Sequence, residues 1–260
     1  MVRARITAVD QRRPDLRKPF PKKFVARLTG QIVKALDRRA KYLVASLSSG
    51  ETLLMHLGMS GSFRTIREGS KVRPELIGLD PHDHVVFHMS SGCAVVFNDP
   101  RRFGSMELVA KGKLGSHPVI GRLGPEPLAD DFDGAALARA CRGKKTSLKA
   151  ALLDQRVVAG LGNIYVSEAL HLAGLSPTRS ASILATPSGA PRESAFRLAK
   201  TIKQVLERAI ARQTARTYRD SRFQVYDREG EPCTKKGCIG VIRRRVQGGR
   251  STFFCSDCQR

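Results

Sequence analysis

Several residue types and sequence features are scarce or absent in this chain, and each absence excludes some classes of protein. There is no tryptophan, and aromatic residues make up 6% of the 260 residues, so widespread stacking of aromatic rings on nucleic-acid bases is excluded. The sequence contains no apolar run of the roughly 18 residues that a membrane helix needs. The first 13 residues also lack the apolar core of a signal peptide. We therefore expect no membrane partner and a cytoplasmic location.

Acidic residues are also scarce relative to basic ones. The chain has 23 Asp and Glu against 46 Lys and Arg, which gives a net charge of +23 and a pI near 10.6. This excess predicts a polyanionic partner, first of all nucleic acid. An anionic membrane surface is the competing partner, but the sequence has no evident basic amphipathic anchor. Hydrophobic residues make up 41% of the chain, enough for one or two domains with cores of their own.

Cysteine is infrequent but concentrated, because four of the six cysteines lie close to the C-terminus. Cys233 and Cys238 are separated by four residues, and Cys255 and Cys258 by two, with 16 residues between the pairs. Four thiolates in two closely spaced pairs are typical of a tetrahedral zinc site. Two disulfides are the alternative, which a basic chain of cytosolic character disfavours. Cys93 and Cys141 lie in apolar contexts and are expected to be small buried side chains.

The 16 residues between the cysteine pairs have the pattern of a β-hairpin. Residues 239–246 form one expected strand, Gly248 and Gly249 the turn, and residues 251–254 the return strand. The hairpin is strongly basic, with arginines at positions 243, 244, 245 and 250. It therefore presents cations to an anionic partner.

The remainder of the chain changes character near residue 110. Short apolar or alternating runs predict strands in the first part, at residues 3–9, 41–47, 52–57, 84–89 and 94–97, which favours a sandwich or flattened barrel. Residues 111–127 are rich in glycine and proline and predict a linker. Helical patterns follow at residues 132–141, 148–155, 164–173 and 193–212. Asp130 and Asp131 are the expected N-cap residues of the first of these helices.

A glycine-rich turn, residues 157–163, separates two of the expected helices. Its glycines allow close approach of the backbone, and amide groups beside a helix N-terminus suit a phosphate. The alternative is a tight connection between helices, and the spacing alone leaves both open.

Five segments together resemble one known family. They are HLGMSG at 56–61, HDH at 82–84, DPRRFG at 99–104, GLGNIY at 160–165 and VYDREGEPC at 225–233, followed by the cysteine-rich hairpin. In this order they closely resemble the bacterial formamidopyrimidine-DNA glycosylases, or 8-oxoguanine DNA glycosylases, of the Fpg/Nei family. The resemblance implies an α+β fold with an N-terminal β-sandwich (1–125), a helix-two-turn-helix domain (126–221) and a zinc-finger hairpin (222–260). Duplex DNA would lie between the domains.

The resemblance also implies an activity. Such a protein would remove oxidised purines, namely 8-oxoguanine and formamidopyrimidines, from duplex DNA and nick the abasic site by β,δ-elimination. The damaged nucleotide must be flipped out of the helix, and side chains must fill the space it leaves. Met59, Arg101 and Phe103 match the residues that do so in the family. Their ordinary alternatives are core positions for Met59 and Phe103 and a surface charge for Arg101.

Further site residues are implied by the same resemblance. Lys41 matches the lysine of the β-elimination step, with a phosphate contact as its alternative, and Arg250 matches the arginine of the δ-elimination step. His82, Lys144 and Asn163, together with Arg101, match contacts to the DNA backbone, and Lys145 and Lys149 could share this work. Zinc is the implied cofactor and DNA with oxidised bases or abasic sites the implied partner. We expect a monomer in the bacterial cytoplasm, associated with the nucleoid through DNA.

Two departures from the family pattern limit what the resemblance implies. The family begins with a proline whose amine attacks the sugar, followed by a glutamate, whereas this sequence begins Met1-Val2-Arg3. An ordinary lysine is far less deprotonated at neutral pH than such an α-amine, so Lys41 is a poor substitute. We expect the natural start to lie about twenty residues upstream; the alternative is a truncated relative that binds damaged DNA without cutting it. The second departure is a short segment at 214–224, which puts capping of 8-oxoguanine in doubt.

Two other classes of function compete with the enzyme. A non-catalytic protein that binds damaged DNA predicts salt-dependent binding without cleavage. An RNA- or ribosome-associated zinc-ribbon protein agrees with the charge and the cysteines, but it leaves the HLGMSG and DPRRFG segments unexplained.

Overall fold

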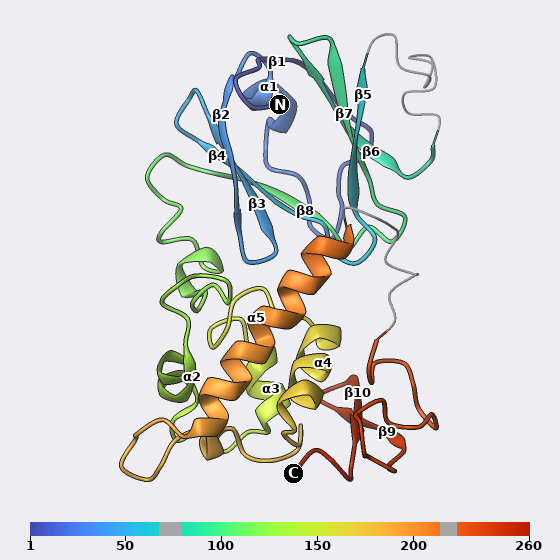
Figure 1. The fold of residues 1–260 in the computed structure, drawn as a ribbon. Coiled ribbons are helices and arrows are strands. Elements are labelled where there is room, and N and C mark those ends of the chain that lie inside the picture. Colours follow the sequence, from blue (N-terminus) through green and yellow to red (C-terminus); the bar gives the residue numbers. More distant parts are fainter. Residues whose placement is uncertain (68–79, 214–222) are drawn as a thin grey trace. The chain divides into compact units, whose positions relative to one another are not determined.

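The computed structural model describes residues 1–67, 80–213 and 223–260 and divides the chain into two compact units, Met1–Arg122 and Leu123–Arg260 (Figure 1). The division lies within the segment expected to be a linker. The three-domain division at residues 125 and 221 stays a prediction, because its second boundary falls outside the described residues.

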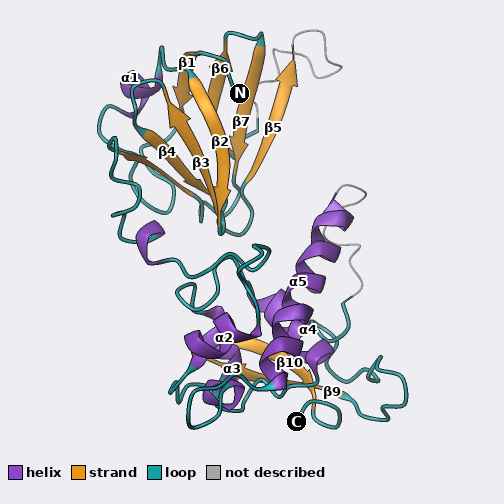
Figure 2. Ribbon diagram, turned by 60° about the vertical axis from the view of Figure 1, so that its left-hand side comes forward, coloured by secondary structure: helices purple, strands orange, loops and turns teal. Residues whose placement is uncertain are grey.

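The first unit contains two four-stranded antiparallel sheets (Figure 2). One sheet has the order β1 (Ile6–Gln11), β6 (Asp83–Met89), β7 (Cys93–Asn98), β5 (Ser62–Arg67). The other has the order β2 (Val33–Arg39), β3 (Tyr42–Leu47), β4 (Thr52–His56), β8 (Ser105–Val109). A short helix, α1 (Phe24–Leu28), buries Phe24 and Leu28 in the same core.

Alternation of side chains along the strands explains how the sheets form one core. In β6, Val85, Phe87 and Met89 point into the cluster that both sheets share. Val86, between them, packs on the opposite face with Val96. Successive side chains of a strand point to opposite faces, so one apolar face of each sheet is buried against the other. The expected β-sandwich is confirmed.

Strands β2, β5 and β8 and helix α1 were not expected from the sequence. All three strands lie at sheet edges, and β2 and β5 have charged and largely exposed side chains. Edge strands need no continuous apolar face, and charge there discourages pairing with other chains. The apolar alternation that predicts inner strands is therefore weak in them.

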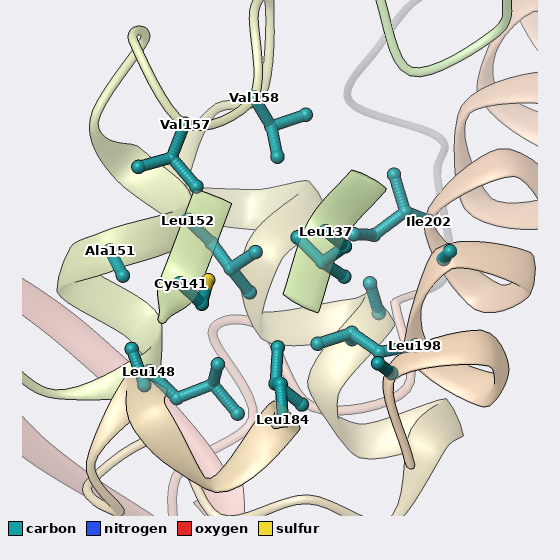
Figure 3. Close-up of a cluster of buried hydrophobic side chains, with 14 of the residues drawn as sticks. Leu137, Cys141, Leu148, Ala151, Leu152, Val157, Val158, Leu184, Leu198 and Ile202 are labelled. Atoms are coloured by element: carbon teal, nitrogen blue, oxygen red, sulfur yellow. The ribbon is translucent and has the colours of Figure 1, made fainter. Parts of the chain in front are cut away.

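The second unit is helical and ends in a hairpin. Its helices are α2 (Gly134–Cys141), α3 (Leu148–Leu153), α4 (Asn163–Ala173) and α5 (Glu193–Gln213), with a 3-10 turn, η3, at Ala181–Leu184; a second such turn, η2 (Ile120–Arg122), ends the first unit. The hairpin pairs β9 (Ile242–Gln247) with β10 (Arg250–Cys255). Apolar side chains from all the helices, among them Leu137, Leu152 and Ile202, form one buried cluster (Figure 3).

Two details of the helices differ from expectation. The N-cap of α2 is Asp133, whose carboxylate accepts a 2.7 Å hydrogen bond from the Ala136 amide, and not Asp130 or Asp131. Helix α3 ends at Leu153, before Gln155, because the backbone of Asp154 is extended, with φ of −71° and ψ of 112°. Within the described ranges, none of the helices has the length and apolarity needed to cross a membrane.

Candidate functional site

Two loops of the first unit bring the three expected void-filling side chains to the surface. Met59 follows β4 and is 71% exposed, whereas Phe103, between β7 and β8, is 40% exposed. The Arg101 guanidinium lies 4.7 Å from the centroid of the Phe103 ring, a cation–π contact that orients both side chains. The alternative of core positions for Met59 and Phe103 is wrong, because both side chains are available to a ligand.

The buried carboxylate of Asp99 connects these two loops. One of its oxygens accepts a 2.5 Å hydrogen bond from the Ser60 hydroxyl, and the other accepts a 2.8 Å bond from the Gly104 amide. The Ser60 oxygen in turn accepts from the Arg101 amide at 3.1 Å. Asp99 is fully buried, so each of these bonds lies in a medium where it is stronger than in water. The loops are therefore fixed relative to each other.

Glycines allow the close approach of the two loops and the tight turn within the first of them. Gly58 has φ of +66°, and a Cβ there would lie 2.4 Å from the Phe103 carbonyl carbon. A Cβ on Gly61 would lie 2.3 Å from the Leu57 oxygen. Only glycine fits at both places, which explains their presence in the HLGMSG segment.

Lys41 lies at the same end of this unit. It is exposed in the β2–β3 turn, next to Ala40, which has φ of +53°. Strand register places Tyr42 opposite His56, and His56 opposite Ser105, so the turn lies beside the ends of β4 and β8. The His56 Nδ1 accepts a 2.9 Å hydrogen bond from the Gly58 amide. Burial, reinforced by the charges of Lys41 and Arg17, lowers the pKa of His56.

His56 is a further candidate residue of this site that the sequence alone did not single out. It is the first residue of the HLGMSG segment, but its contact with the Tyr42 ring, at 4.8 Å between centroids, depends on strand register. His82 is exposed, and its carbonyl accepts a 3.0 Å bond from the Asp99 amide. His82 therefore borders the segment that contains Arg101.

In the second unit, two side chains hold one carbonyl group of the hairpin. The Lys149 Nζ donates to the Ser251 carbonyl at 2.8 Å and to the Thr252 hydroxyl at 2.6 Å. The Asn163 amide donates to the same Ser251 carbonyl at 2.9 Å. Ser251 directly follows Arg250, which is exposed, so these bonds fix the backbone that bears the Arg250 side chain.

The interpretation of Lys149 as a further phosphate contact is wrong. Its side chain is fully buried, and burial, with a smaller effect of Arg250, lowers its pKa from 10.5 to about 8. Lys149 is an internal support of the hairpin. Lys144 lies after α2, and its backbone carbonyl accepts from the Ser180 hydroxyl at 3.0 Å. Lys145 is exposed.

The glycine-rich turn makes internal contacts. Gly160 has φ of +80°, and its amide donates to the Gln155 side-chain oxygen at 2.9 Å, while the Gln155 amide donates to the Leu161 carbonyl at 3.0 Å. Because Gln155 binds the Gly160 amide, this amide is not available to a phosphate. Asn163, at the first position of α4, follows the turn.

The four C-terminal cysteines converge on one point. Their Sγ atoms all lie within 4.8 Å of one another, with 3.8 Å between Cys233 and Cys258 and 3.6 Å between Cys238 and Cys255. A disulfide would require about 2.05 Å between sulfurs. A tetrahedral ion with bonds of about 2.3 Å to sulfur separates its ligands by about 3.8 Å. The residues therefore fit a metal ion held by four thiolates.

Comparisons with known proteins agree with this geometry. Residues 1–106 match the family model of the formamidopyrimidine-DNA glycosylase N-terminal domain, and residues 123–220 match that of its H2TH domain. The chain is 57% identical to the formamidopyrimidine-DNA glycosylase of Bradyrhizobium sp. (strain ORS 278), over 99% of this chain and 93% of the relative. It is 56% identical to that of Methylocella silvestris, over 100% of this chain and 94% of the relative.

Solved structures of the same kind are similar over the whole chain. The Lactococcus lactis enzyme bound non-covalently to DNA with an AP site matches with a TM-score of 0.81 and 29% identity, over 100% of this chain and 94% of that one. The Thermus thermophilus protein matches with a TM-score of 0.80 and 34% identity, over 100% of this chain and 92% of that one. The sequence segments, the two folded units and these relatives lead to one conclusion: the chain belongs to the formamidopyrimidine-DNA glycosylase family.

Proposed function

We propose that this protein is a base-excision-repair DNA glycosylase and AP lyase for oxidised purines in duplex DNA. Relatives that are more than 50% identical in sequence are named formamidopyrimidine-DNA glycosylase. Similar solved structures contain DNA with an AP site, a Fapy-dG or a carbocyclic 8-oxo-G. The observation that supports the proposal most is the exposed group of Met59, Arg101 and Phe103. The loops that bear these side chains are held together by hydrogen bonds to the buried Asp99 carboxylate.

This exposed group suits the filling of a vacated base site. Flipping a nucleotide out of a duplex leaves a stacked gap, and unstacking costs a few kcal/mol per step. An apolar thioether and an aromatic ring replace lost stacking, and a guanidinium offers hydrogen-bond donors to the unpaired base opposite. Because the loops are fixed before binding, little conformational entropy is lost when the DNA arrives.

We assign the backbone contacts and the elimination steps to basic side chains. His82, Lys144 and Asn163, with Arg101, contact phosphates around the lesion; Asn163 does so through its backbone amide at the start of α4, because its side-chain amide binds the Ser251 carbonyl. The exposed Arg250 holds the phosphates that flank the lesion during δ-elimination. A planar guanidinium fork binds a phosphate in bidentate fashion, which suits this role. Lys41 acts in β-elimination, since its turn lies beside the end of β4, where Met59 follows.

We assign zinc to the four-cysteine site, in a structural role. A complete set of four sulfur ligands leaves no open position for a substrate, and zinc prefers this tetrahedral arrangement without redox chemistry. The ion would hold the hairpin that bears Arg250. The protein acts as a monomer in the bacterial cytoplasm, where its DNA substrate lies.

A cleavage assay with the protein purified from its own cells tests the proposal. We expect release of 8-oxoguanine from a lesion duplex and a nick with phosphate at both ends, with no cleavage of undamaged duplex. Arg101→Ala should lower excision at least about 10-fold, whereas Arg122→Ala, a matched loss of an exposed arginine in the same unit, should not. Salt-dependent binding without base release would instead identify a non-catalytic damage-binding protein, and preference for structured RNA over lesion duplex would contradict both.

A further inference from the structure

Helix α4 packs beside strand β10 of the hairpin (Figure 1). Three polar side chains of this helix contact the C-terminal segment. Asn163, at its first position, binds the Ser251 carbonyl. The buried Glu168 carboxylate accepts hydrogen bonds from three successive amides, those of residues 224–226, at 2.8 to 3.0 Å. His171, one turn further on, lies with Nε2 3.3 Å from the Cys233 Sγ. The first two contacts fix backbone, and the third contacts a cysteine of the metal centre.

The contact with Cys233 has a defined direction. A metal-bound cysteine is a thiolate, which can accept but not donate a hydrogen bond. The His171 Nε2 must then bear the proton, because a neutral imidazole has one donor and one acceptor nitrogen. The other nitrogen, Nδ1, is buried and has no hydrogen-bond partner within the described part of the chain. In this tautomer Nδ1 carries a lone pair and no proton, so no buried N–H is left without an acceptor. The surroundings of both nitrogens are therefore consistent with donation from Nε2 to the sulfur.

His171 is not needed as a ligand itself. The four cysteines already supply a complete tetrahedral set, and a zinc–nitrogen bond would require about 2.0 Å. The side chain is 4% exposed, so water does not compete for Nε2. A centre of four thiolates and one divalent cation is doubly negative, and a donor in its outer shell offsets part of that charge.

We infer that His171 is a positioning residue of the metal centre: its Nε2–H donates to the metal-bound Cys233 thiolate and ties the cysteine cluster to helix α4. The inference rests on the metal site proposed above. Since the same helix holds Ser251 through Asn163, the bond connects the metal centre to the support of Arg250. Outer-shell partners of this kind change metal affinity by about 10- to 100-fold.

Cadmium substitution in the full chain tests the bond without any variant. We expect one 113Cd resonance in the range of four-thiolate sites, and a weak coupling between 113Cd and the proton on His171 Nε2, transmitted through the sulfur. A strong one-bond coupling from 113Cd to a His171 nitrogen would show direct ligation and overturn the inference. A four-thiolate resonance with no coupling to His171 would overturn it as well.

Variants of His171 measure the effect of this hydrogen bond on metal release. His171→Phe keeps a ring and removes the donor, and it should speed metal release to a chelator about 10-fold and move the 113Cd resonance. His171→Gln retains an N–H near the position of Nε2 and should restore both readouts. Ser167→Ala is the matched control, because it removes a buried hydroxyl on the same helix that binds the Asn163 carbonyl rather than a cysteine. It should leave both readouts unchanged.

The outcomes separate the inference from the metal proposal. Release rates that are equal in wild type, His171→Phe and Ser167→Ala, with cadmium bound by four thiolates, would refute the role of His171 and leave the metal site intact. A cadmium resonance outside the four-thiolate range would refute the metal site itself and the inference with it.

Discussion

The Ser60 hydroxyl donates a 2.5 Å hydrogen bond to the buried Asp99 carboxylate, and this bond connects the loop of Met59 to the loop of Arg101. The same carboxylate binds the Gly104 amide, next to Phe103. A fully buried group thus determines where three exposed side chains lie. The chemistry proposed for the surface depends on a residue that no ligand would touch.

Replacing Asp99 by alanine should release both loops. The Ser60 hydroxyl and Gly104 amide would lose their partner in a buried setting, at a cost of about 3 kcal/mol in the free energy of unfolding. Affinity for a lesion duplex should fall more than affinity for undamaged duplex. Urea unfolding and binding titrations measure both. Asp10→Ala, which removes a half-exposed partner of His88, is the control and should cost less than about 1 kcal/mol. Equal losses for the two variants would contradict the role of Asp99.

Gly58→Ala should separate backbone strain from close packing. Both Gly58 and Gly112 have positive φ, and alanine in that conformation costs about 1 kcal/mol at either place. At Gly112 the new Cβ meets nothing within 4 Å, whereas at Gly58 it lies 2.4 Å from the Phe103 backbone. Gly58→Ala should therefore lower the free energy of unfolding at least about 2 kcal/mol more than Gly112→Ala. Similar values from urea unfolding would show that the two loops are not in contact there.

Lys149 should give the protein a measurable dependence of stability on pH. Because folding lowers the pKa of Lys149 from 10.5 to about 8, the unfolded chain binds more protons between these values. The free energy of unfolding therefore rises by about 3 kcal/mol as the pH rises from 8 to 10.5. It falls by the same amount as the pH returns to 8.

The variant Lys149→Met removes that titration. The difference in free energy of unfolding between wild type and Lys149→Met should grow from pH 7 to pH 10.5, as measured by urea unfolding at each pH. Thr201→Val, which removes a buried hydroxyl that does not titrate in this range, should give a difference that stays constant. A constant difference for Lys149→Met would mean that the amine is charged and solvated in the folded protein.

Loss of the metal should detach Arg250 from its position. Cys255→Ser removes one of four ligands, and we expect less than one zinc per chain, an unfolded hairpin and a loss of lesion-duplex affinity of at least about 10-fold. Metal analysis and binding titrations check this. Cys93→Ser is the matched control, since Cys93 lies on β7 and outside the cluster. Full affinity in Cys255→Ser would contradict a role of the hairpin in DNA binding.

The parts that the sequence predicted best are those with local signals. The spacing of Cys233, Cys238, Cys255 and Cys258 predicted both the cluster and the hairpin between the pairs, and Gly248 and Gly249 adopt the positive φ expected of its turn. Helix α4 was expected at residues 164–173 and is found at Asn163–Ala173, closed by Gly174 with φ of +67°. Such features depend on the types and spacing of residues that are close together in the sequence.

The parts that were missed depend on contacts between distant segments. Lys149 is close to Lys144 in the sequence, and this proximity suggested a phosphate contact. Its Nζ instead donates to the carbonyl of Ser251, 102 residues away. Asp99 was noted only as part of the DPRRFG segment, because its partner Ser60 is 39 residues earlier. The short segment at 214–224, which put 8-oxoguanine capping in doubt, lies almost wholly outside the described residues.

Borohydride trapping tests the central claim most directly. A bifunctional glycosylase passes through an imine between a protein amine and the sugar C1′, which borohydride reduces to a stable covalent bond. With the protein purified from its own cells and a duplex containing 8-oxoguanine, we predict one covalent protein–DNA adduct that undamaged duplex does not give. Tight binding to the lesion duplex with no adduct and no base release would contradict the account and leave a protein that recognises damage without removing it.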